Sequence, residues 1–190
     1  REAADDVHWY GDPEGHALRQ ALANKHGVDS SEVALGSGID ELLGLFVRLF
    51  VNPGDPVVTS LGAYPTFNYH VDGYGGGLHC VPYKDDCEDL QGLEEMARRQ
   101  EPKLVYVVNP DNPMGTWHQS EALAALAANL PEHSLLLLDE AYADFAPQEA
   151  LLRPDVNGAC IVHLRTFSKA HGMAGARIGY AIAPRALVEG

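Results

Sequence analysis

Short apolar runs and longer amphipathic stretches follow one another along the chain. Seven of the apolar runs, rich in Val, Leu and Ile, have the length and pattern typical of buried strands. They span residues 33–36, 56–60, 77–82, 103–109, 134–139, 160–166 and 176–183. Stretches with the apolar spacing of helices separate most of them. This order predicts an α/β fold of three layers, in which helices cover both faces of a mostly parallel, seven-stranded sheet.

Local signals indicate where helices begin and end. Asp12 followed by Pro13 predicts a helix that starts at Pro13 with Asp12 as its N-cap, and Gly27 predicts its end. Further helices are predicted in IDELLGLFVRLFV, EDLQGLEEMARRQ and SEALAALAANL, and in part of AYPTFNYHVDGY. No helix-length segment separates the last two predicted strands, so we expect the final strand to run antiparallel to its neighbour.

Length and charge narrow the class of protein. The chain has 190 residues, 46% of them hydrophobic, which is enough for one domain with a sizeable core. The formal net charge of -14 argues against nucleic acid as a partner, because binding to a phosphate backbone needs a basic surface. No apolar run approaches the roughly 20 residues of a membrane span, so we expect no membrane association.

Cysteines and histidines indicate neither a disulfide framework nor a metal centre. Cys80, Cys87 and Cys160 form no CxxC pair, which favours reduced thiols and a cytoplasmic location. The nine histidines form no HExxH motif and no cluster with cysteine, so no metal site is predicted. The glycine-rich segment 73–77 fits no phosphate-binding pattern and is interpreted as a turn between a helix and a strand.

Four polar segments follow predicted strands, and in sheets of this kind ligands bind beyond the carboxyl ends of the strands. The segments are GSGID (36–40), NPDNPMG (109–115), DEAY (139–142) and TFSK (166–169). Each has a structural interpretation when taken alone. In the same order, these are a turn with a capping serine, a rigid loop, a helix N-cap and a lysine–carboxylate pair.

The segments DEAY and TFSK, together with Asn112 of NPDNPMG, carry side chains that suit an aromatic aldehyde. The amine of Lys169 can form a Schiff base with an aldehyde carbon. The carboxylate of Asp139 ends an apolar strand, where it needs a partner such as a protonated ring nitrogen. Asn112 and Tyr142 have side chains that can bond a phenolic oxygen.

The remaining polar groups suit a phosphate. The GSGID loop opens a predicted helix, so its free backbone N–H groups and the helix dipole favour an anion. The hydroxyls of Thr166 and Ser168 and the guanidinium of Arg177 are further phosphate ligands. An aldehyde, a ring nitrogen, a phenolic oxygen and a phosphate together describe pyridoxal phosphate.

The same segments resemble the motifs of a known family. RTFSKAHGMAGARIGY resembles the lysine motif of the class I and II aminotransferases of fold type I, especially of their histidinol-phosphate aminotransferase branch. NPDNPMG resembles the family's NPxNPTG, DEAYADF its DEAYxxF, and GSGIDEL its GxGxDEL. The likeness covers nearly the whole chain. Met114 departs from it by replacing a threonine, and Ile39 stands where a small residue is common.

The resemblance implies a role for each site residue. It implies that Lys169 is the Schiff-base lysine, that Asp139 pairs with the pyridinium nitrogen, and that Asn112 and Tyr142 bond the ring hydroxyl. Phe67, in YPTF, would stack on the cofactor ring. The implied catalytic residues are Lys169, Asp139 and Tyr142. The residues implied to hold the phosphate are Gly38, Ile39, Asp40, Thr166, Ser168 and Arg177.

The resemblance also implies an assembly and a domain. Tyr10, in WYGDPEG, resembles a tyrosine that reaches the phosphate of a neighbouring subunit, which implies a homodimer with shared active sites. Family members are longer, and their smaller domain carries the arginine that grips the substrate carboxylate. We therefore expect residues 1–190 to be most of the cofactor-binding large domain of a partial sequence, with that arginine outside it.

The implied activity is transfer of an amino group from an amino acid or an amino-alcohol phosphate, of the histidinol-phosphate kind, to a 2-keto acid. Two alternatives stay open. One is a pyridoxal-phosphate-dependent decarboxylase of the threonine-phosphate type, which the motifs do not separate because the deciding contacts lie on the substrate side. The other is a non-catalytic ligand-sensing module, for which an attached DNA-binding segment would be the discriminating feature.

Overall fold

Seven strands form one sheet in the computed structural model, which describes residues 8–156, 158 and 161–189. The strands are β1 (Val33–Gly36), β2 (Pro56–Leu61), β3 (Gly77–Pro82), β4 (Leu104–Val108), β5 (Leu135–Asp139), β6 (Ile161–Thr166) and β7 (Gly179–Ile182). All seven predicted strands are confirmed, although several ends differ by one to three residues. Cys160, predicted to begin the sixth strand, lies outside the described residues.

The strand order is β1-β7-β6-β5-β4-β2-β3. Neighbouring strands from β3 to β6 run parallel, whereas β7 runs antiparallel to both of its neighbours, β6 and β1. The predicted antiparallel final strand is therefore confirmed. Because β7 lies between β1 and β6, it pairs Gly36 near the start of the chain with Gly179 near its end.

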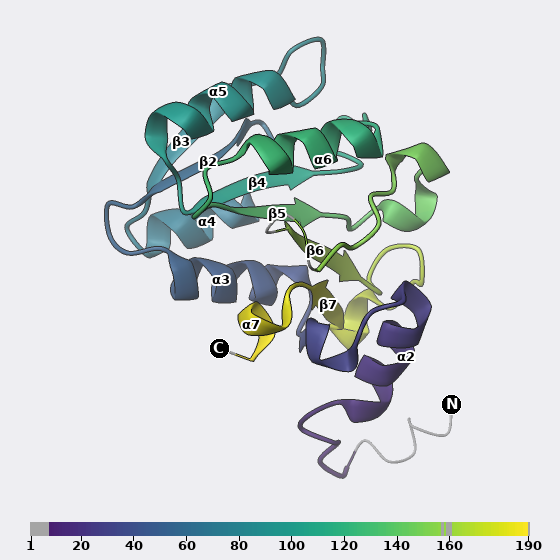
Figure 1. The fold of residues 1–190 in the computed structure, drawn as a ribbon. Helices are drawn as coiled ribbons and strands as arrows, with labels where there is room; N and C mark the ends of the chain where they lie inside the picture. Colours follow the sequence, from purple (N-terminus) through teal and green to yellow (C-terminus); the bar gives the residue numbers. More distant parts are fainter. Residues whose placement is uncertain (1–7, 157, 159–160, 190) are drawn as a thin grey trace.

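Helices cover both faces of the sheet, which confirms the three-layer α/β fold (Figure 1). They are α2 (His16–His26), α3 (Ile39–Phe50), α4 (Thr66–Gly73), α5 (Leu90–Gln100), α6 (Ser120–Asn129) and α7 (Arg185–Val188). Short 3₁₀ turns span Ser30–Glu32, Ala143–Phe145, Gln148–Ala150 and Ala174–Ala176. Helices α5 and α6 pack on one face, α3 and α4 pack on the other, and α2 covers the end formed by β1 and β7.

The apolar runs of the central strands are continuous because both faces of these strands are buried. In β4, Val105 packs towards α5 and α6, whereas the neighbouring Tyr106 packs towards α3 and α4. Leu136 and Leu137 of β5 alternate in the same way. Alternation of side chains along a strand therefore places every second residue of a central strand on the α3–α4 face.

The first helix begins later than the sequence predicted. Asp12 does accept backbone hydrogen bonds, from the N–H groups of Glu14 (3.0 Å) and His16 (2.7 Å), but it does so across a turn. Gly15 then adopts a left-handed conformation with φ 59°, and α2 starts only at His16. The predicted end at Gly27 is confirmed, since this residue has φ 71° and closes the helix.

One edge of the sheet collects the predicted polar segments. Strands β1, β4, β5 and β6 run in the same direction, so their carboxyl ends lie at this edge, where the antiparallel β7 begins (Figure 1). The segments GSGID, NPDNPMG, DEAY and TFSK leave from these four strand ends, and Arg177 lies two residues before the start of β7. The fold therefore brings together residues that are far apart in the sequence.

Within the part of the chain that the structure describes, no helix has both the length and the apolar character needed to span a membrane. The same residues include no group of three or more His, Cys, Asp or Glu side chains placed to hold a metal ion.

Candidate active site

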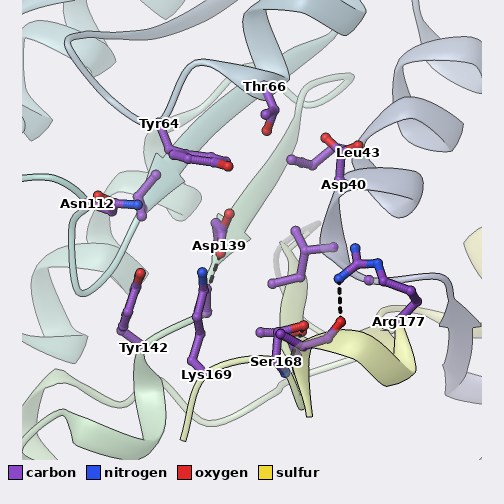
Figure 2. A pocket seen from close by; sticks show the side chains of 16 residues that line it. Asp40, Leu43, Tyr64, Thr66, Asn112, Asp139, Tyr142, Ser168, Lys169 and Arg177 are labelled. Atoms are coloured by element: carbon purple, nitrogen blue, oxygen red, sulfur yellow. Dashed lines mark hydrogen bonds between the residues drawn. The ribbon is translucent and has the colours of Figure 1, made fainter. Parts of the chain in front are cut away.

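A pocket of about 200 Å³ lies at this edge of the sheet and gathers ten of the twelve predicted site residues (Figure 2). The ten are Gly38, Ile39, Asp40, Asn112, Asp139, Tyr142, Thr166, Ser168, Lys169 and Arg177. Figure 2 shows Lys169 and Asp139 in the middle, with Asn112 and Tyr142 on one side and Arg177 on the other. The two predicted residues that do not line the pocket are Phe67 and Tyr10.

Lys169 lies in the turn that follows β6, and its amine points into the pocket (Figure 2). Its Nζ atom is 5.4 Å from the centre of the Tyr142 ring, a distance at which the ring face attracts a cation. The turn is held by the backbone N–H of Phe167, which donates to the carbonyl of Ile178, and by that of Gly172, which donates to the carbonyl of Lys169. The amine is thus presented by a braced loop, where it can react with an aldehyde.

Asp139 is the last residue of β5 and is 5% exposed. Its carboxylate accepts two hydrogen bonds, from the hydroxyl of Tyr106 (2.8 Å) and from the backbone N–H of Ala141 (3.0 Å). Burial raises the pKa of Asp139 to about 6, against the effect of these hydrogen bonds and of Lys169. No α-helix starts here, so the predicted alternative of a helix N-cap is wrong. A buried carboxylate of this kind suits a cationic ring nitrogen.

Glu140 points to the opposite face of the sheet, as strand alternation requires. Its carboxylate accepts from Nε of Arg165 (2.9 Å) and lies 3.2 Å from Nδ1 of His163. Burial opposes ionisation of Glu140, but these two partners hold its pKa below the usual value. The two adjacent acids of DEAY therefore have different tasks: Asp139 faces the pocket, and Glu140 joins β5 to β6 behind it.

The anion end of the pocket lies where β1 ends and α3 begins. Gly38 is the N-cap of α3 and provides no side-chain cap, and the hydroxyl of Ser37 does not cap the helix either. The predicted alternative of a turn with a capping serine is therefore wrong. The free backbone N–H groups of the first turn are available to an anion.

Arg177 is held at the same end of the pocket. Its guanidinium donates to the carbonyl of Ser37 (3.2 Å) and to the carbonyl of Ala174 (3.1 Å). A Cβ atom on Gly179 would lie 2.6 Å from the carbonyl carbon of Gly38, so glycine is needed where β7 passes this loop. The close approach places a cation beside a helix N-terminus, an arrangement suited to a phosphate.

Thr166 and Ser168 are coupled to each other. Oγ1 of Thr166 lies 3.0 Å from Oγ of Ser168 and 3.2 Å from the carbonyl oxygen of Ile178, and it accepts from the backbone N–H of Ser168 (3.1 Å). The hydroxyl of Thr166, which also lines the pocket, is thus engaged with Ser168 and Ile178. The hydroxyl hydrogen of Ser168 remains free to donate to an anion in the pocket.

The two asparagines of the NPDNPMG loop differ in their surroundings. Asn109 is 2% exposed, accepts from the backbone N–H of His118 (2.8 Å) and donates to the carbonyl of Ala150 (3.0 Å). Asn109 therefore fastens the loop to its neighbours. Asn112 lines the pocket, next to Tyr142 (Figure 2).

The structure corrects the prediction for Phe67. This residue is fully buried in the core beneath α4, and its ring stacks on that of Tyr106 with centroids 4.4 Å apart. Phe67 and Val71 are one helical turn apart and both face the core, which keeps Phe67 out of the pocket. Within the YPTF segment, the aromatic side chain that lines the pocket is Tyr64, three residues before Phe67.

Tyr10 is also outside the pocket of its own chain. Its side chain is fully exposed and lies in the segment before α2. Tyr10 therefore does not contact the pocket of its own chain.

Six lining residues were missed from the sequence: Leu43, Tyr64, Thr66, Val108, Ala141 and Ala174. Among them, Thr66 stands out because its Oγ1 atom is buried and has no hydrogen-bond partner among the described residues. A buried hydroxyl is normally satisfied, so this one is suited to a polar ligand atom. Together with the glycine-lined anion end and the buried Asp139, it fits the phosphate and ring of pyridoxal phosphate.

Comparison with known proteins agrees with this chemistry. The model of the family described as aminotransferase class I and II matches residues 1–190. The histidinol-phosphate aminotransferase of Anaeromyxobacter sp. (strain Fw109-5) is 39% identical, over 100% of this chain and 53% of the relative. The chain spans about half the length of the curated relatives it matches.

Solved structures give the same result. The histidinol-phosphate aminotransferase from Sinorhizobium meliloti, in complex with pyridoxal-5'-phosphate, has a TM-score of 0.96 and 52% identity, over 100% of this chain and 52% of that one. The L-threonine-O-3-phosphate decarboxylase from Porphyromonas gingivalis has a TM-score of 0.85 but 22% identity, over 99% of this chain and 58% of that one, which is a likeness of fold alone.

Proposed function

We propose a function from one premise: the chain belongs to the class I and II aminotransferase family, whose model matches residues 1–190. The proposed activity is pyridoxal-phosphate-dependent transfer of an amino group from an amino acid or an amino-alcohol phosphate, of the histidinol-phosphate kind, to a 2-keto acid. Because this chain spans about half of its relatives, the activity is proposed for the complete protein. The observation that carries the proposal is the meeting of Lys169, Asp139 and Arg177 in one pocket.

The relatives support both the cofactor and the substrate class. A solved relative that is 52% identical is named histidinol-phosphate aminotransferase and is in complex with pyridoxal-5'-phosphate. Bound pyridoxal phosphate supplies a ring that withdraws electrons from the bonds at the α-carbon of an amine substrate. The residues of this chain would bind and orient that group and move protons around it.

Lys169 is the proposed catalytic residue at the aldehyde. Its amine would hold the aldehyde carbon until an amine substrate replaces it. The released amine would then take the proton from the substrate α-carbon and return it to the cofactor carbon, as a base and then as an acid. The position of Nζ in the middle of the pocket, 5.4 Å from the Tyr142 ring centre, supports this role.

Asp139, Tyr142, Asn112 and Tyr64 are the proposed ligands of the ring. Asp139 would hold the proton of the ring nitrogen, a task that suits a buried carboxylate. Tyr142 and Asn112, side by side on one wall, would bond the ring hydroxyl oxygen. Tyr64 would stack on the ring in the place first assigned to Phe67.

The phosphate would bind at the start of α3. Its proposed ligands are the backbone N–H groups of Ile39 and Asp40 after Gly38, the hydroxyl of Ser168, and the guanidinium of Arg177. Thr166 would act through Ser168, which it holds.

The same premise supports proposals about assembly and domain. The full exposure of Tyr10, away from the pocket of its own chain, is compatible with a homodimer in which this side chain reaches the neighbouring subunit's phosphate site. Residues 1–190 would form most of the cofactor-binding large domain. A cytoplasmic location is proposed because Cys80 and Cys87 are free thiols.

The named relatives favour amino transfer over the two alternatives. The decarboxylase from Porphyromonas gingivalis is 22% identical, whereas the aminotransferase relatives cited above are 39% and 52% identical. The family model and the aminotransferase names of these relatives also favour an enzyme over a non-catalytic sensing module.

The proposed cofactor site is tested by borohydride reduction. The complete protein is incubated with pyridoxal phosphate, reduced and digested, and mass spectrometry locates the adduct. We expect it on Lys169, and we expect Lys169→Ala to lose it while the circular dichroism spectrum stays unchanged. Lys103→Ala, at a lysine outside the pocket, should keep the adduct. A folded protein with no adduct, or with one elsewhere, would contradict the proposal.

The reaction class is tested by a single turnover with histidinol phosphate. We expect conversion of the bound cofactor to its amine form and formation of a carbonyl product. Threonine phosphate is the comparison substrate, and release of CO₂ from it would favour the decarboxylase instead.

A further inference from the structure

Tyr106 lies beneath the pocket and is the largest fully buried side chain among the described residues. Its position on β4 places it on the same face of the sheet as Asp139 of the neighbouring strand β5. Its hydroxyl oxygen is 2.8 Å from Oδ2 of Asp139. The hydroxyl does not line the pocket, so Tyr106 reaches the site only through this carboxylate.

The hydroxyl can act only as a donor towards a charged Asp139. Burial and the nearby carboxylate raise the pKa of Tyr106 above its usual value, which keeps its proton in place. The backbone N–H of Ala141 donates to the other oxygen, Oδ1, at 3.0 Å. The two donors fix both oxygens, so the plane of the carboxylate and the direction of its free lone pairs are set by β4 and by the turn after β5.

The ring of Tyr106 is itself held in place. Phe67 of α4 stacks on it, with centroids 4.4 Å apart and planes 21° apart. A contact chain therefore runs from α4 through Phe67 and Tyr106 to Asp139. Phe67, which was first assigned to the cofactor ring, thus supports Asp139 through Tyr106 instead.

Several charged groups influence the ionisation of Asp139. The hydroxyl of Tyr106 is one of the two hydrogen-bond donors in direct contact with this carboxylate. Lys169, across the pocket, favours the charged carboxylate, whereas the adjacent Glu140 disfavours it. Glu88, which accepts from the backbone N–H of Val108 at the end of β4 (2.9 Å), also disfavours it when charged, but burial raises the pKa of Glu88 to about 8, which lessens its charge at pH 7. With burial acting against ionisation, removal of a donor from the carboxylate should shift its balance towards the protonated form.

We propose that Tyr106 is a positioning residue that keeps the carboxylate of Asp139 ionised and aimed at the cofactor ring nitrogen. The inference rests on the proposed function, because it deepens the role given there to Asp139. Tyr106 touches neither cofactor nor substrate, and it acts by donating one hydrogen bond from the apolar core. A purely structural role would require only the ring of Tyr106, whereas this role requires its oxygen.

The test removes that oxygen and keeps the ring. In Tyr106→Phe, the carboxyl carbon of Asp139 is titrated by carbon-13 NMR in the cofactor-free complete protein. We expect the pKa of Asp139 to rise by about one pH unit or more, since a hydrogen bond to a charged group is worth about a tenfold change in such an equilibrium. The pH below which pyridoxal phosphate affinity falls should rise by the same amount.

Tyr83→Phe is the matched control. It removes another phenol oxygen that donates to a carboxylate, here Oδ1 of Asp111 at 2.8 Å, and Asp111 does not line this pocket. We expect this variant to leave both the Asp139 titration and the pH profile of cofactor affinity unchanged. Phe67→Leu should lower stability, while the Asp139 titration should move less than in Tyr106→Phe, because the hydroxyl remains.

An unchanged Asp139 titration in a folded Tyr106→Phe variant would overturn the inference. If that variant does not fold, the hydroxyl proton of Tyr106 is observed in the unaltered protein. A proton that is protected from exchange and whose signal follows the Asp139 titration supports the inference, and a rapidly exchanging one refutes it. Absence of cofactor binding by the unaltered protein would contradict the proposed function, while the cofactor-free titration would still decide the role of Tyr106.

Discussion

A Cβ atom on Gly38 would lie 2.5 Å from Nη2 of Arg177. The guanidinium therefore occupies the space that any other residue at position 38 would need. Gly38 also has φ 89°, a conformation that residues with a side chain rarely adopt. The glycine thus opens the start of α3 to an anion and makes room for the cation beside it.

Gly38→Ala should therefore lose cofactor affinity by more than backbone strain explains. We expect the new methyl group to displace Arg177 and to raise the Kd for pyridoxal phosphate about tenfold or more, measured by equilibrium dialysis. Gly54→Ala is the control, because Gly54 has φ 88° but no atom within 4 Å of an added Cβ. Both variants should lose about 1–3 kcal/mol of stability through strain. Equal affinities in the two variants would contradict the role given to Gly38.

Tyr64 and Phe67 should separate binding from stability. Tyr64→Ala removes a half-exposed ring from the pocket, and we expect a weaker Kd for the cofactor, about tenfold, with little change in the free energy of unfolding. Phe67→Ala removes a fully buried ring, and we expect a loss of about 3–5 kcal/mol in that free energy. Urea unfolding of the cofactor-free protein gives the stabilities. The reverse pattern would restore the first assignment of Phe67 to the ring.

The sequence predicted the pocket well because its motifs are local. GSGID, NPDNPMG, DEAY and TFSK each follow an apolar run, and parallel strands bring their carboxyl ends to one edge. Ten of the predicted site residues therefore line one pocket, although they come from four separate strand ends and the start of β7.

Other features depend on packing that no local pattern carries. Tyr106 lies in the apolar run LVYVV, where its hydroxyl gives no sign of a partner on another strand. Tyr64 and Phe67 lie in one segment, and only the orientation of α4 decides which faces the pocket. The insertion of β7 between β1 and β6 is a long-range pairing, so the order of strands is not readable from the chain either.

Asp139 should make the stability of the cofactor-free protein depend on pH. Its native pKa of about 6 lies above the ordinary value of 3.8, so the folded protein holds this proton more tightly than the unfolded chain does. This contribution to stability is complete below about pH 4 and is lost as pH rises to about 6. Asp139→Asn cannot titrate, so its stability relative to the unaltered protein should improve by about 2 kcal/mol between pH 4 and pH 8. Urea unfolding of both proteins at pH 4 and pH 8 measures this change. The same difference in free energy of unfolding between the two proteins at both pH values would contradict the prediction.

Glu140 should be needed for folding more than for binding. Glu140→Ala leaves Arg165, which is 14% exposed, without its carboxylate partner, and we expect a loss of about 3–5 kcal/mol. Glu189→Ala breaks the exposed pair with Arg185 and should change stability little, since both side chains are solvated. Thermal unfolding compares the two variants. A small effect of Glu140→Ala would mean that water replaces the carboxylate behind the sheet.

The pairing of β1 with β7 has a consequence during protein synthesis. Strand β1 stands at the edge of the sheet, and its one neighbour there, β7, leaves the ribosome only after strands β2 to β6 have done so. At about 5–20 residues per second, the growing chain waits on the order of ten seconds between these two strands. Throughout that interval Gly38 has no Arg177 beside it. The nascent chain therefore completes the anion site at the start of α3 only after strands β1 to β6 and the loop that carries Lys169 have been made. Capture of the cofactor would thus report that translation has passed residue 179.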